Sequence, residues 1–233
     1  MPIKGALFDF SGTLFRIESV RSWLAATLAE RKLHVDQADF EQYVRELEVS
    51  GALPGGPPPR RVPEDLAAAW ATRDESAHLH RETYTALARQ VELPDPGLYD
   101  ALYERHLSPA AWQPYPDAAE VLASLRDRGV AIGVVSNIGW DLRPVFRAHG
   151  LDAYVDAYVL SFEHGVQKPD ARLFHTACTL LGQDPADVVM VGDDRRADGG
   201  ASALGCEVRF VQHAPVDERP DGLRELGLAA EVA

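Results

Sequence analysis

From residue 114 to the C-terminus, short apolar runs alternate with stretches of helical periodicity. The runs cover residues 130–135, 158–160, 188–191 and 208–211, and each is short enough for a buried strand. Strands separated by helices need crossover connections, so they pair in parallel within one sheet. A further apolar run, residues 5–8, lies near the start of the chain. The pattern therefore predicts an α/β fold with a doubly wound, Rossmann-like parallel sheet.

A long stretch without a clear strand signal separates the first apolar run from the others. Val20, Leu24 and Leu28 recur at helical spacing, and similar patterns follow along this stretch. The run PGGPPP at residues 54–59 can be neither helix nor central strand, so it should be an exposed loop. We predict that residues 1–15 and 114–233 form the α/β core, and that residues 16–113 form an inserted all-helical cap domain.

The net charge of −13 argues against a nucleic-acid partner or an anionic membrane partner. No apolar run reaches the ~20 residues of a membrane span, and the first residues lack the pattern of a signal peptide. Cys178 and Cys206 lack metal-binding spacing, so we expect two reduced, buried thiols. The chain is expected to be cytoplasmic and to be a monomer or a homodimer.

Polar side chains follow the predicted strands at the points where ligand sites form in parallel sheets. Asp9 follows the first strand, Ser136 and Asn137 follow the second, and Lys168 lies in a later loop. A cluster of acids, Asp193, Asp194 and Asp198, follows the strand at residues 188–191. Each feature alone also fits a turn, a helix cap or a solvated loop. Their order along the chain is what favours a shared site.

The ordered segments DFSGT, VVSN, QKPD and VGDDRRAD resemble the four motifs of the haloacid dehalogenase-like hydrolase superfamily. The helical insertion resembles the C1-type cap of that superfamily. The resemblance implies a Mg²⁺-dependent phosphatase that acts on a small phosphorylated metabolite through an aspartyl phosphate on Asp9. A metal and a lysine would be needed to cancel charge as the carboxylate approaches phosphate. The implied phosphate ligands are Thr13, Ser136, Asn137 and Lys168, and the implied metal ligands are Asp9, the Ser11 carbonyl, Asp193 and Asp198.

Ser11 departs from the superfamily pattern, because phosphatases usually carry a second aspartate at this catalytic position. That aspartate protonates the leaving group and then activates water. A serine hydroxyl is a poor acid and a poor base, and losing such a group costs typically ~10²–10⁴ in rate. The metal site should survive, since this position offers its carbonyl. We therefore expect a slow phosphatase, or one that acts on substrates with good leaving groups.

Other functions remain open at the level of sequence. The chain could be an attenuated module that binds a phosphorylated ligand or a protein. It could resemble 2-haloacid dehalogenases, although their fourth motif lacks acids such as Asp193 and Asp194. A phosphonate hydrolase would need a cap lysine, and Lys32 is the only lysine in the insertion. Specificity candidates near the motifs are Arg16, Trp23 and Arg143, whereas His78, His80 and His106 lack the spacing of a metal site and should be exposed or hydrogen-bonded.

Overall fold

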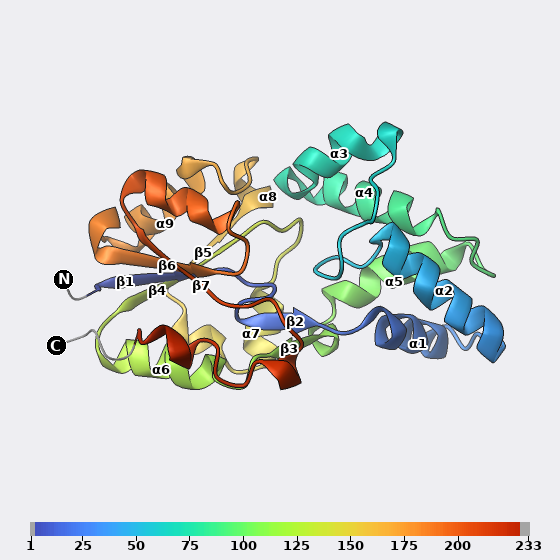
Figure 1. The fold of residues 1–233 in the computed structure, drawn as a ribbon, viewed down its shortest axis with the longest axis horizontal. Coiled ribbons are helices and arrows are strands. Elements are labelled where there is room, and N and C mark those ends of the chain that lie inside the picture. The colour runs from blue at the N-terminus through green and yellow to red at the C-terminus, as the bar shows by residue number, and fades with distance from the viewer. Residues whose placement is uncertain (1–2, 229–233) are drawn as a thin grey trace.

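The computed structural model describes residues 3–228 and contains a five-stranded parallel sheet (Figure 1). The strand order is β5-β4-β1-β6-β7. The strands are β1 (Gly5–Phe8), β4 (Ala131–Ser136), β5 (Ala157–Leu160), β6 (Val188–Gly192) and β7 (Glu207–Phe210). All neighbours pair in parallel, with Phe8 aligned to Val134 on one side and to Val191 on the other. The α/β fold with a doubly wound sheet is thereby confirmed.

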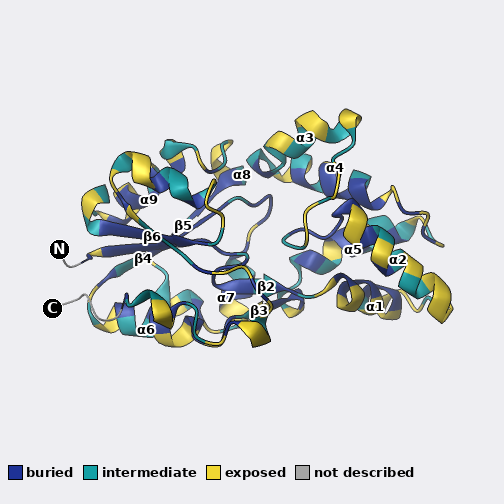
Figure 2. Ribbon diagram, in the orientation of Figure 1, coloured by how far each residue is buried: buried dark blue, intermediate teal, exposed yellow. Residues whose placement is uncertain are grey.

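Helices cover both faces of the sheet, because side chains alternate between the two faces of a strand. Ala6 and Phe8 of β1 belong to one core cluster, which takes in residues of α6 (Ala118–Asp127) and α7 (Arg143–Ala148). Leu7 belongs to a second cluster with residues of α9 (Ala171–Leu181). Helix α8 (Ser161–His164) follows β5 directly. Strands β1, β4, β5 and β6 are buried along most of their length, whereas the edge strand β7 is partly exposed. Exposed residues lie on the outer sides of the helices (Figure 2).

The remaining helices form what we call the helical insertion, residues 20–107. They are α1 (Val20–Glu30), α2 (Gln37–Ser50), α3 (Ala67–Thr72), α4 (Ala77–Ala88) and α5 (Gly97–Leu107). The insertion lies beyond the end of the sheet opposite the two chain termini (Figure 1). Short 3₁₀ helices complete the elements: η1 (Glu64–Leu66), η2 (Arg73–Glu75), η3 (Pro109–Ala111), η4 (Asp152–Tyr154), η5 (Pro185–Asp187), η6 (Asp198–Leu204), η7 (Val216–Glu218) and η8 (Arg224–Leu226).

A two-stranded antiparallel ribbon connects the sheet to the helical insertion. Strand β2 (Phe15–Ile17) leads into the insertion, β3 (Trp112–Pro114) leads out, and the two strands pair with each other. The sequence pattern gave no sign of these strands, because three residues are too few for a periodicity to appear. The ribbon brings the two connections side by side at one point of the core.

Asp117 precedes α6 but does not cap it with its side chain. Its Oδ2 instead accepts hydrogen bonds from the backbone N–H groups of Leu223 and Arg224, at 2.7 and 3.0 Å. Cys178 and Cys206 are free and buried, as expected. Among the described residues, no helix combines the length and apolar character needed to span a membrane.

Candidate active site

Asp9 emerges from the carboxyl end of the central strand β1. Its backbone N–H donates to the carbonyl of Val191 at 2.9 Å, which continues the pairing of β1 with β6 for one more residue. The chain then turns tightly, with the N–H groups of Leu14 and Phe15 both donating to the carbonyl of Phe10. Asp9 is buried but lines a cavity at this edge of the sheet. A strand end at the centre of a parallel sheet is where such folds place their ligand sites.

Arg219, far along the chain, holds the turn after Asp9 in place. Its guanidinium donates to the carbonyls of Gly12 and Thr13, at 2.6 and 2.5 Å, and stacks on the ring of Tyr115. Thr13 is fully buried, and its Oγ1 has no hydrogen-bond partner among the described residues. Thr13 is also not one of the residues that line the cavity. Its position therefore fits a role in fixing the turn better than direct contact with phosphate.

Lys168 forms a buried ion-paired bridge between two carboxylates. Its Nζ lies 2.6 Å from Asp9 Oδ1 and 2.6 Å from Asp198 Oδ1. Burial raises the pKa of Asp9 to about 7, although the charge of Lys168 acts in the opposite direction. Burial alone would lower the pKa of Lys168, but the charges of Asp198 and Asp9 outweigh it and the pKa is raised. Lys168 is therefore a fixed cation beside Asp9 at neutral pH.

Three carboxylates converge in a way that suits a divalent cation. Asp9, Asp193 and Asp198 each offer an oxygen atom, and these atoms lie within 4.8 Å of one another. Hard cations such as Mg²⁺ prefer oxygen ligands of this kind, so the donor set fits. Asp198 already uses one oxygen for Lys168 and accepts the N–H of Asp194 with the other, at 3.0 Å. Asp9 and Asp193 are thus the better placed direct ligands, and Asp198 is better placed to support them.

The second motif contributes a buried hydroxyl and a backbone clamp. Ser136 ends β4 and lines the cavity. The side chain of Asn137 donates from Nδ2 to the carbonyl of Lys168 at 3.0 Å and accepts the N–H of Lys168 at 2.6 Å. Both ends of the amide are therefore used to hold the loop that carries Lys168. This clamp was not foreseen, because sequence reasoning treated Asn137 as a phosphate ligand.

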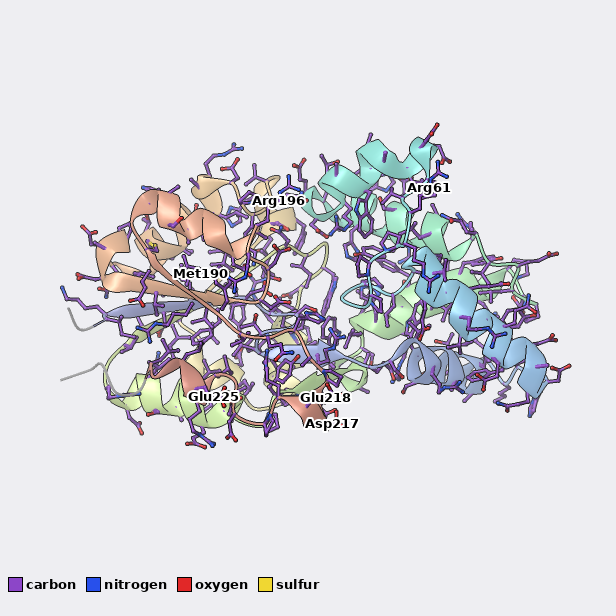
Figure 3. The ribbon with its side chains drawn as sticks, in the orientation of Figure 1. Arg61, Met190, Arg196, Asp217, Glu218 and Glu225 are labelled. Carbon is purple, nitrogen blue, oxygen red and sulfur yellow. The ribbon has the colours of Figure 1, made fainter. Side chains whose placement is uncertain are left out.

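The cavity has a volume of about 240 Å³ and is roofed by the helical insertion. One part of the roof is the loop at residues 54–58, where a Cβ on Gly55 would lie 2.9 Å from Ser11 Oγ. The other part comprises Trp70, Arg73, Asp74, His80 and Tyr84. Side chains crowd the region where the insertion faces the strand ends (Figure 3). The candidate nucleophile therefore faces a small cavity that the helical insertion partly covers.

The three specificity candidates named from the sequence lie elsewhere. Trp23 is buried within the insertion and donates from Nε1 to the carbonyl of Leu102 at 2.9 Å. Arg143 pairs with Glu163 and Asp141, and Arg16 contacts His213. None of the three lines the cavity in the described part of the chain. Sequence reasoning missed Arg73, Asp74 and Tyr84, which carry no motif and reach the site only through the packing of the insertion.

The histidines of the insertion differ in their surroundings. His78 is exposed, and His80 is buried with its Nδ1 2.7 Å from the hydroxyl of Tyr103. His106 is fully buried, and its Nδ1 contacts the carbonyl of Tyr103. Each histidine is therefore exposed or hydrogen-bonded, as expected, although His106 Nε2 has no partner among the described residues.

Together, the fold and the site define an enzyme with a buried aspartate, a paired lysine and further carboxylates at the carboxyl edge of a parallel sheet. A family model described as haloacid dehalogenase-like hydrolase matches residues 3–203, and the chain belongs to this family. It is 28% identical to (S)-2-haloacid dehalogenase 4A of Burkholderia cepacia, over 96% of this chain and 93% of that protein. It is 30% identical to ribulose-1,5-bisphosphate 5-phosphatase of Halopiger xanaduensis, over 86% of this chain and 81% of that protein.

A solved structure supports the assignment of the fold to this family. The crystal structure of a dehalogenase superposes with a TM-score of 0.64 at 26% identity, covering 96% of this chain and 95% of the other. The relatives therefore include phosphatases and haloacid dehalogenases. The family assignment establishes a hydrolase, and the choice between the two chemistries depends on the site.

Proposed function

We propose that this protein is a Mg²⁺-dependent phosphohydrolase that acts on a small phosphorylated metabolite through an aspartyl phosphate on Asp9. The observation that carries the proposal is the cluster of the buried Asp9, Lys168 and Asp198 with the partly buried Asp193. A phosphatase needs this excess of carboxylates to hold a cation. A dehalogenase, which needs no metal, has no comparable use for Asp193.

In the proposed reaction Asp9 attacks the phosphoryl group, and the other residues compensate its negative charge. The Asp9 oxygen that is not paired with Lys168 attacks phosphorus, and the bond from phosphorus to the leaving oxygen breaks. Lys168 balances negative charge beside the nucleophile, and the Ser136 hydroxyl donates to a phosphoryl oxygen. Bound Mg²⁺ would supply the remaining charge compensation. Water then hydrolyses the acyl phosphate and regenerates Asp9.

Ser11 lowers the expected rate. Ser11 offers no carboxyl group that could protonate the leaving oxygen from the usual position of the general acid. General acid–base groups contribute typically ~10²–10⁴ in rate, so turnover should be slow unless the leaving group is good. Ser11→Asp tests this directly: raised turnover on a poor leaving group, with little change on an acyl phosphate, is the expected result.

The main experiment is a screen of phosphorylated metabolites with Mg²⁺, run on the wild type and on Asp9→Asn. Phosphate release by the wild type and its loss in the variant support the proposal. Equal release by both proteins on every positive substrate would refute it. Beryllium fluoride, a mimic of a bound phosphoryl group, adds a test without turnover: with Mg²⁺ it should raise the melting temperature of the wild type and leave Asp9→Asn unchanged.

A dehalogenase is the second candidate, and the Burkholderia cepacia relative favours it. In that case Asp9 would displace halide from carbon and form an ester. The discriminating measurement is chloride release from the two enantiomers of 2-chloropropionate in EDTA. Asp9-dependent chloride release without any phosphatase activity would replace the first proposal with this one.

A further inference from the structure

Arg73 presents a fixed guanidinium to the cavity from the helical insertion. Its guanidinium carbon lies 3.9 Å from the centre of the Trp70 ring, Nη1 donates to the Trp70 carbonyl at 2.7 Å, and Nε donates to the Tyr84 hydroxyl at 3.3 Å. Arginine has five N–H donors, so these contacts leave several of them unused. Arg73 and Lys168 are the only arginine or lysine residues that line the cavity in the described part of the chain. Lys168 is already committed to Asp9 and Asp198.

Asp74 lies next to Arg73, and its carboxylate lacks good partners. The residue is 4% exposed and lines the same cavity. Its Oδ2 is 3.4 Å from Arg73 Nη2, its Oδ1 is 3.8 Å from His80 Nε2, and no hydrogen bond reaches the carboxylate from the described residues. A buried carboxylate without hydrogen bonds is costly, so this group is suited to accept donors from a ligand.

The Arg73–Asp74 pair is held at a fixed place over the rest of the site. The backbone carbonyl of Asp74 accepts a hydrogen bond from Ser161 Oγ at 2.5 Å. Ser161 in turn accepts the N–H of Ile138, two residues after Ser136, at 2.8 Å. The roof is thus tied to the loop that follows β4. The cavity of about 240 Å³ between them is below the ~300 Å³ typical of pockets for drug-sized ligands, so one small metabolite can reach both sides.

We propose that Arg73 and Asp74 bind the end of the substrate remote from its phosphoryl group, and that this end carries a carboxylate beside a hydroxyl or ammonium group. The inference rests on the proposed function, because it takes Asp9 as the reacting side of the cavity. The planar fork of Arg73 matches a carboxylate, and Asp74 accepts the adjacent O–H or N–H group. The substrate class is then a phosphorylated hydroxy acid or amino acid.

Binding to the Asp9→Asn protein with Mg²⁺, measured by calorimetry, tests the proposal without turnover. The probes are ethyl phosphate, phosphoglycolate, 3-phosphoglycerate and O-phosphoserine. They carry, respectively, neither group, the carboxylate alone, the carboxylate with a hydroxyl, and the carboxylate with an ammonium. The last two should bind roughly ten- to a hundredfold more tightly than ethyl phosphate, the factor expected for one or two charge-assisted hydrogen bonds.

Arg73→Gln, added to the same protein, should remove this advantage and leave the affinity for ethyl phosphate unchanged. Arg81→Gln is the matched control, because Arg81 is a partly exposed arginine of the insertion that does not line the cavity and pairs with Asp100 and Glu104. Asp74→Asn should weaken O-phosphoserine more than phosphoglycolate, since only the former places an ammonium group beside the carboxylate.

The four probes test the roof of the cavity and its reacting side separately. If ethyl phosphate binds but the carboxylate-bearing probes gain nothing, or if Arg73→Gln keeps their advantage, the proposal for the roof is wrong and the phosphohydrolase proposal stands. If none of the four probes binds, both are wrong, because the cavity then does not accept a phosphorylated ligand. Loss of affinity for ethyl phosphate in Arg73→Gln would also overturn the proposal, since it would show a general disruption of the site.

Discussion

Lys168 is the residue on which the site depends most directly. Two carboxylates compete for its ammonium inside the protein, so Lys168→Met leaves both without a cation. Breaking a buried ion pair in this way typically costs about 3–5 kcal/mol. We expect a lower free energy of unfolding in urea and a loss of activity on every substrate. Lys4→Met removes an exposed lysine paired with Asp187 and serves as the control. Full activity in Lys168→Met would rule out its catalytic role.

Gly55 shows how the roof constrains the position of Ser11. Its φ of +76° favours glycine, and a Cβ there would lie 2.8 Å from Trp112 and 2.9 Å from Ser11 Oγ. Gly55→Ala should therefore cost about 1–2 kcal/mol of stability and also lower kcat/KM, because the loop must move off the site. Gly182→Ala is the matched control: its φ is +66°, with no atom within 4 Å. The prediction fails if the two variants have equal kcat/KM.

At the scale of elements, the sequence predicted the parts of the site that lie close to strands. Asp9 and Ser136 follow apolar runs directly, and Asp193 follows one after a single glycine, so the parallel sheet alone brings them to one edge. The clamp between Asn137 and Lys168 joins residues in different loops, and no local pattern encodes it. Arg73 was missed for a stronger reason. It reaches the cavity only because helices of the insertion pack over the sheet, and packing between such distant segments leaves no periodic trace in the sequence.

Helices α4 and α5 each carry a buried histidine, and this makes the insertion sensitive to acid. Burial lowers the pKa of His106 from 6.5 to about 3. Burial also lowers the pKa of His80 well below 6.5, and the nearby His106 ring acts in the same direction. Below pH 6.5 the unfolded chain therefore binds protons that the folded chain does not. Each histidine should therefore contribute a fall in stability of roughly 1.4 kcal/mol per pH unit. Asp9, whose pKa is raised to about 7, contributes in the opposite direction.

Urea unfolding between pH 6.5 and pH 4 measures this dependence. His106→Phe keeps an aromatic ring beside His80, Tyr103 and Trp140 and removes a buried nitrogen that has no partner among the described residues. The free energy of unfolding of this variant should depend less steeply on pH than that of the wild type. His78→Gln changes an exposed histidine of the same helix as His80 and should leave the slope as it is. An unchanged slope in His106→Phe would mean that His106 is protonated in the folded protein.

At the scale of the whole molecule, we expect activity to depend on how the insertion meets the core. Two side chains of the core make hydrogen bonds to the backbone of the insertion. Ser161 Oγ donates to the carbonyl of Asp74 at 2.5 Å, and Gln167 Nε2 donates to the carbonyl of Ala71 at 2.6 Å. Gln167 directly precedes Lys168, so the same loop carries a catalytic candidate and a contact to the roof. Closure of the roof and placement of Lys168 are therefore coupled through the backbone.

Gly139 offers a sharp test of this coupling, because the core and the insertion are in close contact there. A Cβ on Gly139 would lie 2.1 Å from the Cβ of His80, an atom next to the backbone that cannot rotate away. Gly139→Ala must therefore push α4 away from the loop after β4. Gly199→Ala is the control, since its Cβ would meet only Phe210 at 3.9 Å. We expect Gly139→Ala to lose about 1–3 kcal/mol of stability, the usual cost of overpacking. The activity of the folded variant should also fall, so that the loss of activity exceeds what the loss of stability explains. The radius of gyration in small-angle X-ray scattering should increase. A variant with unchanged dimensions and full activity would show that the site works without a closed roof, and the role proposed for Arg73 would then lose its structural basis.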